Sequence, residues 1–154
     1  MTNTDPRAGI EIREVGRADL LSVFRIEKRS FDQPWPYAAF ERFLGGPGFL
    51  VAEADDRIVG YVIADTVDGG GTRIGHIKDL AVAPTHRQQG IGQRLLTRAV
   101  GSLAASGVRQ VKLEVRRTNE TARALYSSFG FERHHVVPDY YDDGEDAYVL
   151  IKRL

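Results

Sequence analysis

A short basic segment with two glycines has the residue types of a phosphate-binding loop. It reads Arg87-Gln88-Gln89-Gly90-Ile91-Gly92 and lies between an apolar run ended by Pro84 and an amphipathic stretch. Unpaired N–H groups at a helix N-terminus carry partial positive charge, and glycines let a pyrophosphate approach the backbone closely. Arg87 adds a full positive charge, and Arg94 can add another. The segment predicts an anion site, and a plain helix-opening turn is the alternative.

Two common nucleotide-binding loops do not fit this segment. A Walker loop requires a following Gly-Lys-Ser or Gly-Lys-Thr, which is missing. A dinucleotide-binding fingerprint requires a third glycine and a downstream acidic residue, which are missing too. Because Gly-x-Gly alone is weak evidence, the rest of the chain must identify the ligand.

A carboxylate on a predicted strand and a pair of tyrosines are further candidates for a site. Glu114 lies in the alternating run Gln110 to Val115, whose apolar residues share one face. An outward-facing ion pair with Arg116 is one interpretation of Glu114. Tyr140 and Tyr141 are adjacent on a predicted loop, where exposed aromatic side chains are typical of a binding surface.

Strand and helix patterns interleave along the chain and would position these residues. Helical spacing between residues 17 and 31 places Leu20, Leu21 and Phe24 on one apolar face, and Pro34 ends the helix. Further helices are predicted at 37–44, 90–106 and 119–129, and strands at 10–15, 49–54, 58–65, 72–82, 110–115, 131–137 and 147–153. This interleaving predicts an α/β or α+β domain with a mixed sheet.

Composition limits the possible functions. The 154 residues are enough for one domain, expected at 10–154 after a polar tail at 1–9. The 21 basic and 21 acidic residues cancel, so no net charge attracts nucleic acid. The absence of cysteine excludes disulfides, cysteine-ligated zinc and a cysteine acyl-enzyme, and we expect no metal in the site. With no signal sequence and no apolar run of roughly 18 residues, we expect a cytoplasmic protein without membrane contact.

Three motifs together resemble the GCN5-related N-acetyltransferase (GNAT) family. The segment Arg87 to Gly92 is similar to its acetyl-CoA pyrophosphate motif. Leu113-Glu114-Val115-Arg116, Asn119, Ala124-Leu125-Tyr126 and Gly130-Phe131 follow in the family's order and spacing. The run from Tyr140 to Tyr148 resembles the ending of protein N-terminal acetyltransferases, which include ribosomal-protein alanine acetyltransferases and archaeal enzymes. The resemblance covers roughly residues 10–154.

The resemblance implies a fold, a cosubstrate and catalytic residues. The family fold has a mostly antiparallel mixed sheet of about seven strands, splayed at its centre, with about four helices. Acetyl-CoA would be the acetyl donor. Glu114 would act as general base directly or through water, His76 would relay the same proton, and Tyr126 would protonate the departing thiolate. Without a cysteine, direct attack by the amine in a ternary complex is favoured over a covalent relay.

The resemblance also implies binding residues. The main-chain groups of Leu80, Ala81 and Val82 would hold the oxyanion and pantetheine where a splayed or bulged strand leaves donors unpaired. Further cofactor contacts are expected from Arg87, Gln88, Gln89, Gly90, Ile91, Gly92, Asn119 and Tyr126. The walls of the substrate entrance would come from Pro34, Trp35, Tyr140 and Tyr141. Trp35 could equally fill the core.

The function predicted from the sequence is acetylation of the N-terminal α-amine of proteins, ribosomal-protein specific or broad. An α-amine has a pKa of about 7.7–8.0 and is partly neutral near neutral pH, whereas lysine at about 10.4 is almost fully charged. The alternatives are a GNAT enzyme for lysine or a small-molecule amine, and a non-catalytic acyl-CoA-binding regulatory domain. The expected partners are protein or peptide N-termini, ribosomal protein included, and nothing in the sequence requires an auxiliary subunit.

Overall fold

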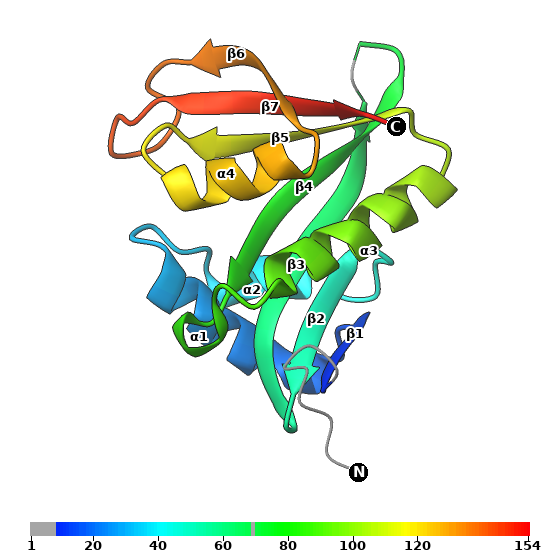
Figure 1. Cartoon of the computed structure of the whole chain (residues 1–154), viewed down its shortest axis with the longest axis vertical. Coiled ribbons are helices and arrows are strands. Elements are labelled where there is room, and N and C mark those ends of the chain that lie inside the picture. The colour runs from blue at the N-terminus through cyan, green and yellow to red at the C-terminus, as the bar shows by residue number, and fades with distance from the viewer. Residues whose placement is uncertain (1–8, 69) are drawn as a thin grey trace.

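Seven strands form one mixed sheet in the order β1-β2-β3-β4-β5-β7-β6 (Figure 1). The computed structural model describes residues 9–68 and 70–154, so nearly all of the tail expected at 1–9 lies outside the described residues. The strands are β1 (Ile10–Glu14), β2 (Phe49–Ala54), β3 (Arg57–Asp68), β4 (Arg73–Val82), β5 (Gln110–Arg116), β6 (Glu132–Val137) and β7 (Ala147–Arg153). Neighbouring strands are antiparallel except β4 and β5.

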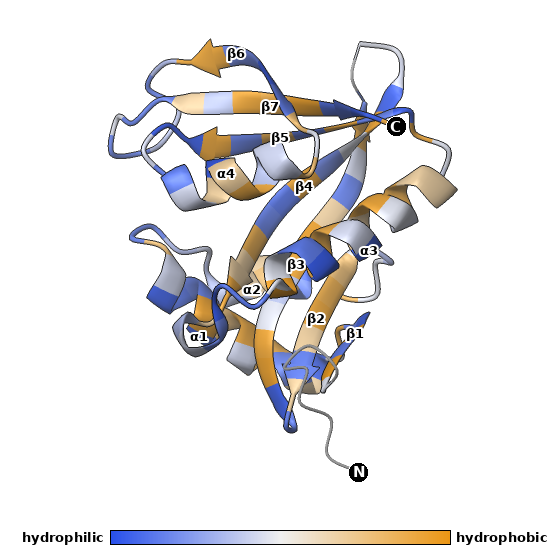
Figure 2. Ribbon diagram, viewed as in Figure 1, coloured by the Kyte–Doolittle hydropathy of each residue, from blue (hydrophilic) through white to orange (hydrophobic). Residues whose placement is uncertain are grey.

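Helices cover both faces of this sheet (Figure 1). They are α1 (Leu20–Ser30) after a 3-10 turn at Arg17–Asp19, α2 (Tyr37–Glu41), α3 (Ile91–Ala105) after a 3-10 turn at Pro84–His86, and α4 (Glu120–Ser128). One core packs residues of α3 and α4 on the sheet, and a second core packs residues of α1 and α2 on it. Figure 2 shows that β2, between these cores, is almost entirely hydrophobic. None of the described helices combines the length and the apolarity that a membrane span requires.

The sheet opens between β4 and β5. These two strands pair only at Gly75 with Val111 and at His76 with Lys112. Lys78 is an extra residue in β4, because Ile77 and Asp79 pair with consecutive residues of β3. From Ile77 to Val82 the side of β4 that faces β5 therefore has no strand partner. This confirms the expected splayed centre of a seven-stranded sheet flanked by four helices.

Two details of the predicted helices were wrong. Leu21 is 49% exposed, because α1 begins at Leu20 and buries the stripe Leu20, Val23, Ile26 and Glu27. The second helix ends at Glu41 instead of residue 44. Bonds from the N–H of residues 43 and 44 to the carbonyls three residues earlier tighten the chain there, before Gly45 adopts a positive φ.

Two glycine substitutions should change stability in opposite directions. A Cβ at Gly48 would lie 2.1 Å from the carbonyl oxygen of Ala64, whereas a Cβ at Gly101 on α3 meets nothing within 4 Å. We expect Gly48→Ala to lower the free energy of unfolding by about 2 kcal/mol or more. Gly101→Ala should raise it by about 0.5–1 kcal/mol, because alanine favours a helix interior. Urea titration measures both, and a shift of the same sign would contradict this packing.

Candidate active site

A cavity of about 560 Å³ lies where β4 and β5 diverge. Its lining comes from β4, β5, α1, α4, the α1–α2 loop and the β6–β7 loop. The lining residues are Glu27, Phe31, Gln33, Trp35, Ile77, Lys78, Asp79, Leu80, Leu113, Glu114, Val115, Arg116, Asn119, Ala122, Tyr126, Tyr140, Tyr141 and Asp142. The cavity thus brings together residues from both halves of the chain.

Glu114 is held by a histidine across the opening of the sheet. Its Oε1 lies 2.7 Å from Nε2 of His76, and the two side chains are only 13% and 16% exposed. Nδ1 of His76 lies 3.3 Å from Nζ of Lys78. A lysine ammonium can only donate, so Nδ1 accepts and the proton of the ring sits on Nε2, facing Glu114. Glu114 does not pair with Arg116, which contacts other carboxylates.

The surroundings of Glu114 keep it ionised. Burial alone would raise the pKa of Glu114, but the hydrogen bond from His76 and the positive charges of Lys112 and Lys78 outweigh it, so the pKa is lowered. Oε2 is buried without a hydrogen-bond partner among the described residues, and the nearest cation, Nζ of Lys112, is 3.7 Å away. Burial, followed by the charge of Glu114, raises the pKa of Tyr140, so a tyrosine hydroxyl also lies near this carboxylate at the cavity.

Tyr126 faces the same cavity from α4. Asn119, Ala122 and Tyr126 recur at helical spacing and line the cavity together. The side chain of Asn119 caps the helix by accepting the N–H of Ala122 at 3.2 Å. Tyr126 is buried against Phe131, and burial raises the pKa of its phenol. Tyr126 therefore carries its proton at neutral pH, and its place in the core does not remove it from the cavity.

The predicted anion loop leads into the N-terminus of α3. Gly90 is the N-cap, with φ of 79°, and Gln88 also has a positive φ. Arg87 donates from Nε to the carbonyl of Val82 at 3.0 Å, which ties the loop to the end of β4. A Cβ at Gly92 would lie 3.3 Å from Leu125 and 4.0 Å from Leu80. Residues 87–92 do not line the cavity, but Gly92 places them next to its Leu80 wall.

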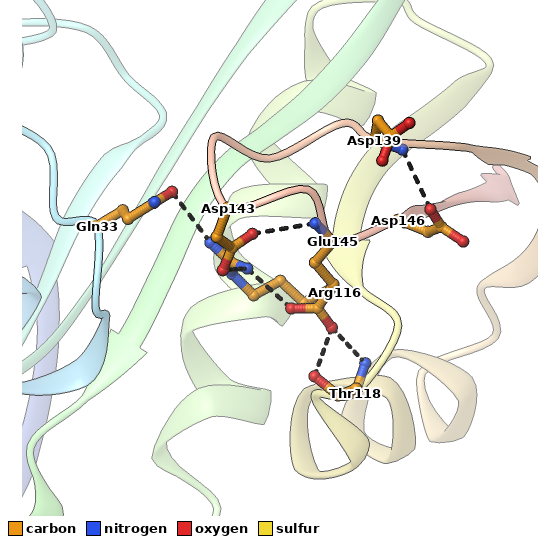
Figure 3. A network of polar contacts seen from close by, with 7 residues as sticks. All are labelled: Gln33, Arg116, Thr118, Asp139, Asp143, Glu145 and Asp146. Atoms are coloured by element: carbon orange, nitrogen blue, oxygen red, sulfur yellow. Dashed lines mark hydrogen bonds and ion pairs between the residues drawn. The ribbon is translucent and has the colours of Figure 1, made fainter.

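One arginine holds the tyrosine-bearing loop in place (Figure 3). Nη1 of Arg116 donates to Asp143 and Glu145 at 2.8 Å each, and Nη2 donates to Gln33 at 3.4 Å. Its guanidinium stacks over the ring of Tyr141, 4.0 Å from the centroid. Arg116 therefore joins the β6–β7 loop to β5 and to the α1–α2 loop across the cavity.

The α1–α2 loop forms the opposite wall through Trp35. Trp35 lines the cavity and also packs on Phe40 and Phe43, with ring centroids 5.6 and 5.8 Å away. Trp35 therefore packs on the core and also reaches the cavity, and its part in substrate binding stays a prediction. Pro34 precedes it and is not among the lining residues, whereas Gln33 is. The part of Pro34 in substrate binding stays a prediction.

Three polar residues beside the cavity were not predicted from the sequence. Glu27 and Asp79 line the cavity, and Tyr61 lies between them in the core of α1 and α2. The signal in the sequence is a glutamate at the spacing of the inward stripe of α1. Nothing in the sequence brings Asp79 to it, because the two residues meet only through the packing of α1 on the sheet.

The chain is similar to known acetyltransferases over most of its length. The model of the "Acetyltransferase (GNAT) family" matches residues 20–131. N-alpha-acetyltransferase RimI of Mycobacterium tuberculosis is 36% identical over 160 residues, with 96% of this chain and 93% of that protein covered. An uncharacterized protein of Mycobacterium leprae is 40% identical over 145 residues, which are 86% of this chain but 38% of that protein. The ribosomal-protein-S18-alanine N-acetyltransferase structure from Escherichia coli gives a TM-score of 0.78 at 28% identity, covering 94% of this chain and 93% of that chain.

Glu145 should make stability depend on pH in the acid range. Hydrogen bonds from the hydroxyl of Thr118, from Arg116 and from the N–H of Thr118 lower the pKa of Glu145 to about 2. A lowered native pKa stabilises the fold above the unfolded value of about 4.3, and this contribution is lost as pH falls toward about 2. We expect Glu145→Gln to be less stable at neutral pH and to lose less stability between about pH 4.5 and about pH 2.

Urea titrations across this pH range measure the difference. The matched control is Glu132→Gln on the exposed strand β6, which removes the same charge from the surface. Parallel stability curves for wild type and Glu145→Gln would show that the network around Arg116 does not stabilise the fold.

Proposed function

Because the chain belongs to the acetyltransferase (GNAT) family, we propose that it transfers the acetyl group of acetyl-CoA to the α-amine at a protein N-terminus. The observation that carries this proposal is the His76–Glu114 pair facing Tyr126 in the gap between β4 and β5. A proton acceptor and a proton donor meet there beside a strand edge with no partner. This is the constellation that transfer of an acetyl group from a thioester to an amine requires.

The described residues fit acetyl-CoA part by part. The unpaired edge of β4 offers main-chain groups of Leu80, Ala81 and Val82 to the pantetheine arm and to the developing oxyanion. The first N–H groups of α3, with the loop of residues 87–92, suit the pyrophosphate. A side chain at Gly92 would take the space between Leu125 and Leu80, so glycine there lets the first turn of α3 pack close to β4 and α4. Asn119 lies beside this path on α4.

In the proposed reaction one residue accepts the proton of the amine and another donates a proton to the thiolate. The neutral amine attacks the thioester carbon from the side of Glu114, whose carboxylate accepts the amine proton directly or through water. His76 holds this carboxylate in orientation through Oε1. As the tetrahedral intermediate collapses, the C–S bond breaks and the hydroxyl of Tyr126 protonates the departing thiolate. The raised pKa of Tyr126 ensures that its proton is present for this step.

The shape of the entrance supports a peptide N-terminus as acceptor. Tyr140 and Tyr141 on one side and Trp35 on the other border the cavity, and Arg116 connects the two walls. Aromatic side chains with polar tips suit extended peptide backbone. The names of the RimI relative and of the Escherichia coli structure support an α-amine acceptor, with alanine of a ribosomal protein as one candidate first residue. We propose that no auxiliary subunit is needed, since one chain supplies every group named here.

Peptide acetylation followed by mass spectrometry tests the proposal. Acetyl-CoA is incubated with peptides beginning Ala, Ser, Met-Glu or Met-Leu and with an N-blocked lysine peptide. We expect acetyl on the α-amine, with Glu114→Gln and Tyr126→Phe each lowering kcat by about a hundredfold, as loss of general base or acid catalysis does. Glu11→Gln, an exposed change on β1 at the far edge of the sheet, is the control. Acetylation confined to lysine, or binding of acetyl-CoA without turnover, would overturn the assignment.

A further inference from the structure

A buried glutamate joins four separate segments behind the cavity. Glu27 is 2% exposed and is the single charged side chain classed as buried among the described residues. Its Oε2 accepts the main-chain N–H of Trp35 at 2.9 Å, and its Oε1 accepts a hydrogen bond from the hydroxyl of Tyr61. The same hydroxyl lies 3.3 Å from Oδ2 of Asp79. Glu27 thus connects α1, the α1–α2 loop, β3 and β4.

The single hydroxyl proton of Tyr61 cannot form hydrogen bonds to both carboxylates, Glu27 and Asp79, at once. Tyr61 has one hydroxyl proton and gives it to Glu27. Toward Asp79 the phenol oxygen can then only accept, so the contact is a hydrogen bond only if Asp79 brings a proton of its own. Two bare carboxylates around one hydroxyl would repel each other in a poorly solvated place. Burial, followed by the proximity of Glu27, raises the pKa of Asp79 in agreement with this count.

We propose that Glu27, Tyr61 and Asp79 form a proton-sharing cluster in which Asp79 is a carboxylic acid, and that Glu27 and Asp79 are positioning residues for acetyl transfer. Glu27 fixes the backbone of Trp35, which forms one wall of the cavity. Asp79 fixes β4 immediately before Leu80, where the unpaired edge begins to hold the acetyl donor. The second role rests on the proposed function, whereas the shared proton does not.

The charge of the cluster matters because Glu114 shares the cavity with it. The other titratable or charged groups that line this cavity are Glu114, Lys78, Arg116, Tyr126, Tyr140, Tyr141 and Asp142. Arg116 is engaged by Asp143 and Glu145, and Lys78 contacts His76. With Asp79 neutral, it does not compete with Glu114, the carboxylate oriented by His76, for the proton of the amine. Two carboxyl groups with opposite protonation in one site are a recurring basis for dividing acid and base roles.

Infrared spectroscopy of the full chain tests the shared proton without any substrate. A protonated carboxyl group has a carbonyl-stretching band separate from that of carboxylates. We expect this band to persist at mildly alkaline pH in the wild type, to disappear in Asp79→Asn, and to shift in Tyr61→Phe, which removes the accepting oxygen. Asp65→Asn, an exposed change on β3, should leave it in place. A wild type without the band, or a band unaffected by both variants, would overturn the cluster.

Steady-state kinetics test the positioning role. Asp79→Asn, which keeps shape and a hydrogen-bond donor, should retain about tenfold more kcat/KM than Asp79→Ala. Glu27→Gln should raise KM for the peptide several-fold, because a neutral amide accepts the N–H of Trp35 less strongly than a carboxylate, and leave KM for acetyl-CoA unchanged. Equal losses in both aspartate variants, or equal changes in both KM values, would contradict positioning. An inactive wild type that shows the band refutes the proposed function alone, and an active wild type without the band refutes the cluster alone.

Discussion

The separation of β4 from β5 is the constraint on which the rest of the site depends. After two paired residues the strands part, and backbone groups that a continuous sheet would satisfy are left facing a cavity. Such unpaired groups are costly unless a ligand or water completes them. Apolar packing offsets this cost in free energy, because the two cores pack on opposite faces of β4. The gap therefore stays open while the strands on either side remain in register.

Polar side chains divide this gap into regions of opposite proton affinity. Glu114, held by His76 and near two lysines, has a lowered pKa, while Tyr126 and Asp79 have raised ones. Burial acts on all three groups in the same direction. The difference therefore comes from the partners that each element supplies, chiefly His76 on β4 for Glu114 and the carboxylate of Glu27 on α1 for Asp79. The fold thus sets the protonation states that the proposed chemistry uses.

Local patterns were enough to predict the elements of the fold, since most helices and strands bury one recognisable face, while β2 is a continuous apolar run. The alternation around Glu114 survives unchanged in β5, whose burial alternates residue by residue. The prediction that Leu21 faces the core was wrong, because the sequence does not distinguish an apolar residue beside the inward stripe from one that belongs to it. Resemblance placed Glu114 and Tyr126 in the site, and both line the cavity. The contact of Glu27 with Tyr61 and Asp79 could not be predicted, because no short-range pattern relates residues that only helix packing brings together.

The extra residue in β4 shifts the alternation of its side chains by one position. Ile77 and Leu80, three positions apart, both pack toward the core of α3 and α4, and Ala81 packs toward the other core. In a regular strand, residues three apart would point to opposite faces. Because Lys78 is absorbed in the bulge, His76 and Asp79, which are also three positions apart, lie on the same side of β4. Deleting Lys78 would leave Asp79 and Leu80 on their present faces, because Ile77 and Asp79 already pair with consecutive residues of β3. The deletion would remove the bulge itself, and with it the contact of Lys78 with His76 at the point where β4 leaves β5.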